Sequence, residues 1–115
     1  MDLFILKQLL IYLLGSLVAL KDEEISFDEL FSTFLKPSLL DLVDSKVEKS
    51  SYSQKFKVLF EEILLIEDIY EMIPDKYDDN LDLFIKKVKK LLKEIETNSN
   101  YGSTPSLIVQ GLKSI

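Results

Sequence analysis

The chain has 115 residues and a formal net charge of −6, with a pI near 4.6, which suits one globular domain and makes nucleic acid a poor partner. It contains no Cys and no His, which excludes disulfides, thiolate metal sites and a Cys or His catalytic group. All 14 basic residues are Lys, so the bidentate arginine contacts that recognise phosphates and base edges are absent as well.

The first predicted helix spans about residues 2–20 and is apolar on nearly every side. Its central run, Leu9 to Leu20, has twelve mostly apolar residues, fewer than the roughly 18–20 that span a bilayer. Asp2 offsets Lys7 near the start and no small-residue cleavage site follows, which argues against a secretory signal. We therefore expect a buried helix at the centre of a bundle, in a cytoplasmic protein without a membrane span.

Two short helices are predicted next. Ser26 begins the first in a capping box, because Glu29 follows three residues later. Pro37 ends this helix, since its ring disfavours helical geometry at the preceding residue, and it opens the next one. We expect the two short helices to pack as a corner that closes one end of the bundle.

Two longer helices follow a polar connection at residues 45–53. One is predicted over about residues 52–73, where Pro74 stops it, and the other over about residues 80–96. The latter repeats apolar residues at helical spacing, with Asp near its start and Lys toward its end, as the helix dipole favours. The predicted fold class is all-α: a small bundle of three long helices with a short helix pair and an irregular C-terminal tail.

The C-terminal residues differ in composition from the rest. Turn-forming residues at 98–103 and Pro105 oppose a helix, whereas residues 106–112 are apolar and partly β-branched. We therefore divide the chain into a helical bundle domain, residues 1–97, and a tail, residues 98–115. The tail is expected to dock on the bundle, although contact with a partner is the alternative, and the sequence leaves the oligomeric state open.

No catalytic residue, cofactor or metal site is predicted. If Glu29 were the last ligand of a calcium loop, Val18 and Leu20 would occupy positions that require carboxylates, so capping explains this segment better. A magnesium site among the acids of residues 75–82 is less expected than a solvated turn at a helix start. The glycines are too far apart to form a phosphate loop, and no Ser or Tyr has a His to activate it.

The strongest functional signal is the charge pattern. Nine acids lie between residues 61 and 82 against Lys76 alone, and basic stretches flank this segment on both sides. We interpret the acids as one ridge that attracts a basic protein and speeds its association, the alternative being an ordinary solvated surface. The predicted partner-binding residues are Glu61, Glu62, Asp68, Glu71, Asp75, Asp78, Asp79 and Asp82.

Three stretches carry a family resemblance: Leu13 to Lys21, Ile25 to Glu29, and Ile66 to Pro74. They are similar to uncharacterised small all-helical bacterial proteins that resemble the immunity proteins of polymorphic and contact-dependent toxin systems. The resemblance covers about the first 95 residues and includes no motif with a chemical role. It implies a cytoplasmic, non-enzymatic inhibitor that binds a cognate toxin domain, often a basic nuclease.

We consider three classes of function for this sequence. The leading hypothesis is an immunity-type inhibitor that neutralises a basic toxin domain through the acidic ridge. The main alternative is a regulatory or scaffolding helical module that binds a partner helix or self-associates, and the salt sensitivity of binding separates it from the first. An enzyme that uses Asp or Glu with Mg²⁺ is the third, and it requires a metal-dependent shift in melting temperature.

Overall fold

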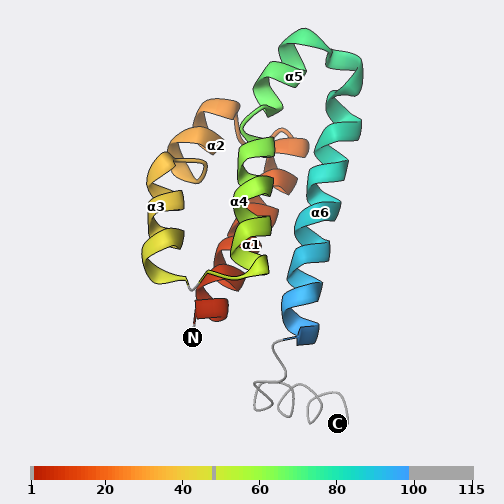
Figure 1. Cartoon of the computed structure of the whole chain (residues 1–115). Helices are drawn as coiled ribbons and strands as arrows, with labels where there is room; N and C mark the ends of the chain where they lie inside the picture. Colours follow the sequence, from red (N-terminus) through yellow and green to blue (C-terminus); the bar gives the residue numbers. More distant parts are fainter. Residues whose placement is uncertain (1, 48, 99–115) are drawn as a thin grey trace.

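A computed structural model describes residues 2–47 and 49–98 of the chain (Figure 1). Its described residues form helices and connecting turns without any strand, which confirms the predicted all-α class. The proposed docking of the tail lies outside the described residues, apart from Asn98, which ends the last helix. The elements in chain order are α1 (Asp2–Lys21), α2 (Phe27–Thr33), α3 (Pro37–Lys46), α4 (Ser51–Ile63), α5 (Ile66–Met72), the short 3₁₀ helix η1 (Pro74–Lys76) and α6 (Tyr77–Asn98).

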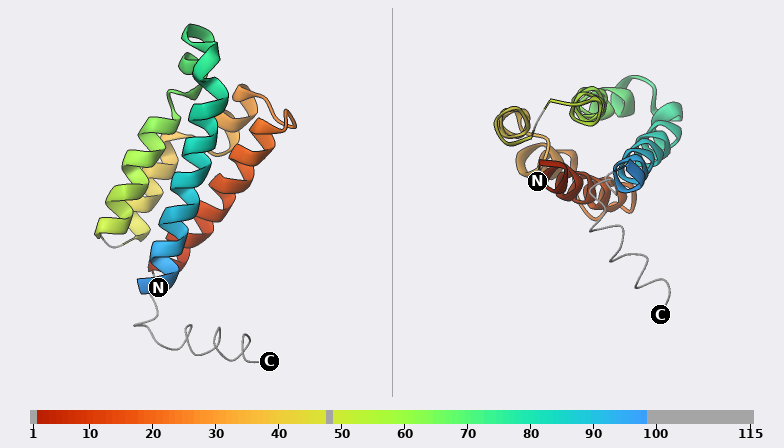
Figure 2. Two further views of the ribbon diagram at one scale, coloured as in Figure 1. Left: turned by 90° about the vertical axis from the view of Figure 1, so that its right-hand side faces the viewer. Right: turned by 60° about the horizontal axis from the view of Figure 1, so that its bottom comes forward.

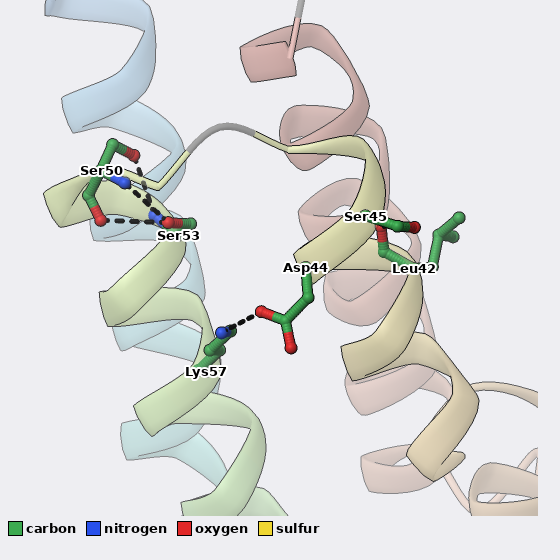
Figure 3. Close-up of polar contacts among 6 residues, drawn as sticks. All are labelled: Leu42, Asp44, Ser45, Ser50, Ser53 and Lys57. Atoms are coloured by element: carbon green, nitrogen blue, oxygen red, sulfur yellow. Dashed lines mark hydrogen bonds and ion pairs between the residues drawn. The ribbon is translucent and has the colours of Figure 1, made fainter.

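The helices α1, α3, α4 and α6 run side by side and surround a shared core (Figures 1 and 2). α1 packs most extensively against α6, which also contacts α4. α3 lies alongside α4 and is joined to it by an ion pair between Asp44 and Lys57 (Figure 3). The short helix pair therefore does not simply close one end of the bundle, because α3 extends along its side and only α2 lies near an end.

The core is built from stripes of apolar residues at helical spacing. In α1 the stripe consists of residues every third or fourth position, each at most 5% exposed. α4 and α6 contribute matching stripes, and the apolar pattern predicted for α6 is confirmed by the burial of Leu81, Val88 and Ile95. Burial of this apolar surface is the main stabilising term of such a bundle. The α1 stripe is Leu6, Leu10, Leu13, Leu17 and Leu20.

The fourth predicted helix, residues 52–73, is not continuous. It breaks at Leu64 and Leu65, where the Leu65 N–H donates to the carbonyl oxygen of Glu62 in a tighter turn. The break redirects α5, so that Leu64, Tyr70 and Ile73, which the helical pattern assigns to the buried face, are 39%, 51% and 51% exposed. The prediction of one long helix was therefore wrong, because neither Gly nor Pro marks the break and tertiary packing decides it.

Capping boxes define the starts of α2 and α4. The Glu29 N–H donates to the Ser26 Oγ at 3.1 Å and the Ser26 N–H donates to the Glu29 Oε1 at 3.0 Å, which confirms the predicted box. At α4, the Ser53 N–H donates to the Ser50 Oγ at 3.2 Å and the Ser50 N–H donates to the Ser53 Oγ at 2.9 Å (Figure 3). The Ser53 hydroxyl also donates to the carbonyl oxygen of Ser50 at 3.0 Å, so this buried hydroxyl is fully satisfied.

α1 is less enclosed than expected for a central helix. Opposite its buried stripe, Phe4, Ile11 and Val18 are 63%, 47% and 39% exposed. The 19-residue window Leu3–Lys21 has a mean hydropathy of 2.1, with 33% of it buried, and is long and apolar enough to cross a membrane. The core helix of a helical bundle can be equally long and apolar. The length of the apolar run therefore does not distinguish a core helix from a membrane-spanning helix.

Candidate functional site

One end of the bundle collects most of the carboxylates. It is formed by the turn after α1, the start of α2, α5, η1 and the first turns of α6 (Figure 1). All of these segments except η1 contribute residues to one hollow. Residues 21–29 and 67–82, which we call the acidic end, contain twelve Asp and Glu residues against two lysines. The rest of the chain carries eight acids and twelve lysines. The two parts of the molecule therefore have opposite net charges.

The predicted acidic ridge lies mostly within this end. Asp68 and Glu71 are exposed on α5, Asp75 is exposed on η1, and Asp78 and Asp79 are exposed on the first turn of α6. Asp78 also lines the hollow. These five residues share one end of the molecule, because the turn between α5 and α6 brings their short segments together.

The other predicted residues of the ridge are placed differently. Glu61 and Glu62 lie on α4, outside the acidic end, and the Lys87 Nζ donates to both carboxylate oxygens of Glu62 at 3.2 and 3.4 Å. Asp82 lies in the acidic end but forms an ion pair with Lys21, and the hydrogen bond from Lys21 to Asp82 raises the pKa of Lys21. Glu62 and Asp82 are thus already neutralised by lysines of this chain.

Sequence reasoning missed half of the acidic end. Five acids come from the segment between α1 and the first turn of α2, which the sequence indicates only as a helix end and a capping box. The sequence does show a run of acids from Asp22 to Glu24. This run lies about forty residues before the predicted ridge, so the sequence does not show that the two segments are close in the fold. The acids contributed by this segment are Asp22, Glu23, Glu24, Asp28 and Glu29.

Three aromatic rings join the helices of the acidic end. The centroids of Tyr70 and Tyr77 are 5.0 Å apart, those of Phe27 and Tyr70 are 5.4 Å apart, and those of Phe27 and Tyr77 are 5.9 Å apart. The planes are tilted or edge-to-face, at 59–83°, which is the favourable arrangement for ring quadrupoles. This ring trio links α2, α5 and α6, and leaves Tyr70 51% exposed.

The hollow beside the ring trio has a volume of about 490 Å³ and opens to solvent. The three rings form its apolar part, together with Leu20 and Ile25. Carboxylates of Glu23, Glu24 and Asp78 are among its polar lining residues. Among the described residues, no group of three or more acidic side chains is arranged to hold a metal ion. The hollow therefore combines aromatic surface with negative charge spread around it.

Glu23 adopts a left-handed backbone conformation, with φ of 60°, in the turn that follows α1. The Glu24 N–H donates to the carbonyl oxygen of Ala19 at 2.8 Å and the Glu23 N–H to that of Leu20 at 3.1 Å, which is the Schellman pattern. Gly is the usual residue at this position, because a Cβ makes the left-handed conformation unfavourable. The chain instead places a carboxylate there, on the rim of the hollow.

Replacing Glu23 by Gly should therefore raise the free energy of unfolding by roughly 0.5–1 kcal/mol, because it relieves the left-handed strain. Glu23→Gln is the matched control, since it removes the charge and keeps the Cβ. Urea denaturation of both variants separates the conformational effect from the loss of a like charge. If Glu23→Gln stabilises the chain as much as Glu23→Gly, repulsion between carboxylates is the cause rather than the backbone.

Burial raises the pKa of the Tyr77 phenol above its usual value of 10.0, and the neighbouring Asp78, Tyr70 and Glu23 raise it further. The raised pKa favours the neutral phenol in the folded chain. The contribution of this shift to stability is complete at pH values below the pKa of Tyr77 in the unfolded chain, near 10. It is lost as the pH rises through the higher pKa of Tyr77 in the folded chain.

Asp78→Asn should lower the pKa of Tyr77, because it removes the neighbouring negative charge that raises this pKa most. An alkaline NMR titration of tyrosine labelled with ¹³C at Cζ follows this phenol separately from the other tyrosines. Asp79→Asn is the control, since Asp79 is the next residue and does not contribute to the shift of Tyr77. Equal decreases in both variants would show that overall charge, not the local arrangement, sets the pKa.

Comparison with protein families gives one finding. The model of the family described as Protein of unknown function (DUF3969) matches residues 5–104, which include nearly all of α1 and every later helix. Comparisons with curated proteins and with solved structures give no match. The acidic end lies entirely within the matched residues.

Proposed function

The chain belongs to the DUF3969 family of proteins of unknown function, and we propose that it is a cytoplasmic immunity-type inhibitor that binds a basic, nuclease-like toxin domain through its acidic end. The observation that supports this most is the separation of charge. Twelve carboxylates against two lysines lie in the acidic end, while the rest of the chain carries more lysines than acids. Such a distribution orients an approaching basic protein toward one end of the molecule.

The chemistry of the acidic end fits binding better than catalysis. Most of its carboxylates on α5, η1 and the start of α6 are exposed, whereas acid–base catalysis usually relies on carboxylates that are set apart by burial in a cleft. A nuclease binds phosphates with a surface rich in positive charge. An acidic surface that covers such a site competes with the nucleic acid and so inhibits the enzyme.

A regulatory or scaffolding module is the second candidate, and the exposed side of α1 favours it. Phe4, Ile11 and Val18 recur every seven residues and leave an apolar stripe on this helix. A partner helix or a second copy that covered this stripe would bind by apolar contact. High salt would not weaken such binding, whereas it weakens attraction between exposed opposite charges.

Affinity capture from the native cells tests the proposal, with the tagged full chain as bait and washes at low and then moderate salt. Two double variants serve as further baits. Asp68→Lys with Glu71→Lys reverses two exposed charges in the acidic end, and Asp41→Lys with Glu96→Lys makes the same net change elsewhere on the chain. We expect a basic partner that salt releases, that the first variant loses and that the control retains.

Two results would contradict the inhibitor proposal. If the bait is recovered alone or as a homo-oligomer, the result contradicts the inhibitor proposal and supports the regulatory or scaffolding module. A partner that binds all three baits equally, and withstands salt, requires a surface other than the acidic end.

A further inference from the structure

We propose that the hollow of the acidic end receives a single alkylammonium or guanidinium group, supplied by a lysine or arginine side chain of the partner, against the ring trio and the carboxylates of Glu23 and Asp78. This inference rests on the proposed function, because it assigns the place where a basic partner inserts one side chain. The sequence did not indicate the ring trio, since Phe27, Tyr70 and Tyr77 belong to three separate helices.

The ring trio selects for a cation. A cation near the face of a Tyr or Phe ring is attracted by the ring quadrupole, and the attraction increases as the cation loses water. Tyr70 is the most accessible of the three rings, at 51% exposed, while Phe27 and Tyr77 are half-buried. The aliphatic stem of a lysine or arginine side chain can lie on this apolar surface while its charged group stays at the rim.

The acidic side chains that line the hollow outnumber the one lysine that this chain places among them. Among the described lining residues Lys21 is that lysine; it pairs with Asp82, and the charge of Asp78 also contributes to its raised pKa. Within residues 2–47 and 49–98, no ion pair joins Glu23, Glu24 or Asp78 to a lysine. A neutral aliphatic group in the hollow would desolvate these carboxylates without pairing them, which is unfavourable. A cationic group compensates them.

The size of the hollow fits a long side chain rather than a peptide segment. A volume of about 490 Å³ lies within the range for small-molecule sites, roughly 300–1,000 Å³, and the hollow is a shallow depression that opens broadly to solvent. A single extended side chain with its hydrating water can enter without moving the helices. Glu23 reaches this rim at the cost of its left-handed backbone, so the charge is placed where Gly would be the more stable residue.

The test is an NMR titration of the full chain with three amino-acid amides. The probes are Nα-acetyl-lysine-N-methylamide, Nα-acetyl-arginine-N-methylamide and, as the uncharged control of similar length, Nα-acetyl-norleucine-N-methylamide. We expect saturable shifts of the ring resonances of Phe27, Tyr70 and Tyr77 with the two cations. The norleucine amide should leave these resonances unchanged.

Two variants make the test specific. Tyr70→Leu removes the most accessible ring and should weaken binding of both cationic probes roughly fivefold. Tyr12→Leu is the matched control, because Tyr12 is 57% exposed on α1, does not line the hollow and should leave the affinity unchanged. Dispersed amide spectra of both variants confirm that they fold.

Several outcomes would overturn the assignment. Equal shifts with the norleucine amide would show an apolar site, and equal affinity in Tyr70→Leu would exclude the rings. Tighter binding of tetramethylammonium than of either amino-acid amide would assign the hollow to a free small cation instead of a partner side chain. The proposed function is tested separately, by charge reversal at Asp68 and Glu71, which do not line the hollow. Failure of the cation site therefore leaves the proposed function untouched, and the reverse also holds.

Discussion

Leu13→Ala is expected to lower the free energy of unfolding by about 2–5 kcal/mol, as truncation of a fully buried leucine does when the surrounding core cannot close the cavity. Leu13 is 0% exposed and lies at the centre of the α1 stripe, with two buried leucines on either side of it along the helix. Small domains are stable by roughly 5–15 kcal/mol, so this single change removes a large fraction of the total. Urea denaturation monitored by circular dichroism measures it.

Ile11→Ala is the matched control for this prediction. Ile11 lies on the same helix, two residues away, and is 47% exposed. Its truncation should change the free energy of unfolding by less than about 1 kcal/mol, because little buried surface is lost and Ala favours the helix. A larger loss for Ile11→Ala than for Leu13→Ala would show that α1 packs through its other face.

Charge reversal in the acidic end is expected to slow association with the captured partner roughly tenfold or more at low salt. The variant is Asp68→Lys with Glu71→Lys, and stopped-flow mixing measures the rate as a function of ionic strength. The dissociation rate should change less, because exposed charges at a rim act mainly on encounter. The difference from wild type should shrink at high salt, since the screening length falls from about 10 Å at 0.1 M to about 3 Å at 1 M.

Asp41→Lys with Glu96→Lys controls for net charge. It makes the same total change on α3 and near the end of α6, and the exposed pair between Glu96 and Lys7 that it disrupts contributes little to stability. We expect a clearly smaller loss of rate. If the two double variants slow association equally, the total charge of the chain attracts the partner and the acidic end has no special part in it.

Most of the fold could be predicted from local patterns, because each helix carries its own signals. The capping box at Ser26 and Glu29 and the unbroken apolar repeat of α6 involve residues close in sequence, and both predictions are confirmed. The break at Leu64 and Leu65 could not be predicted. It lies in a run of apolar residues without Gly or Pro, where a straight helix satisfies the local pattern equally well.

That break also explains why the ring trio of the candidate site was missed. It redirects α5, so that Tyr70 leaves the expected core face and meets Phe27 and Tyr77 beside the hollow. The acids near Glu23 were visible as charges, but contact between segments about forty residues apart depends on tertiary packing. A ridge defined along the sequence therefore included Glu61 and Glu62, which lie on α4, and omitted the acids after α1.

The pairing of α1 with α6 has a consequence for synthesis on the ribosome. α6 begins at Tyr77, roughly 55 residues after α1 ends, so at about 5–20 residues per second the first helix waits several seconds for its main packing partner. During that interval the apolar window, with a mean hydropathy of 2.1, lacks the helix against which it packs most extensively. Burial of the α1 stripe is therefore completed only after nearly the whole bundle has been synthesised.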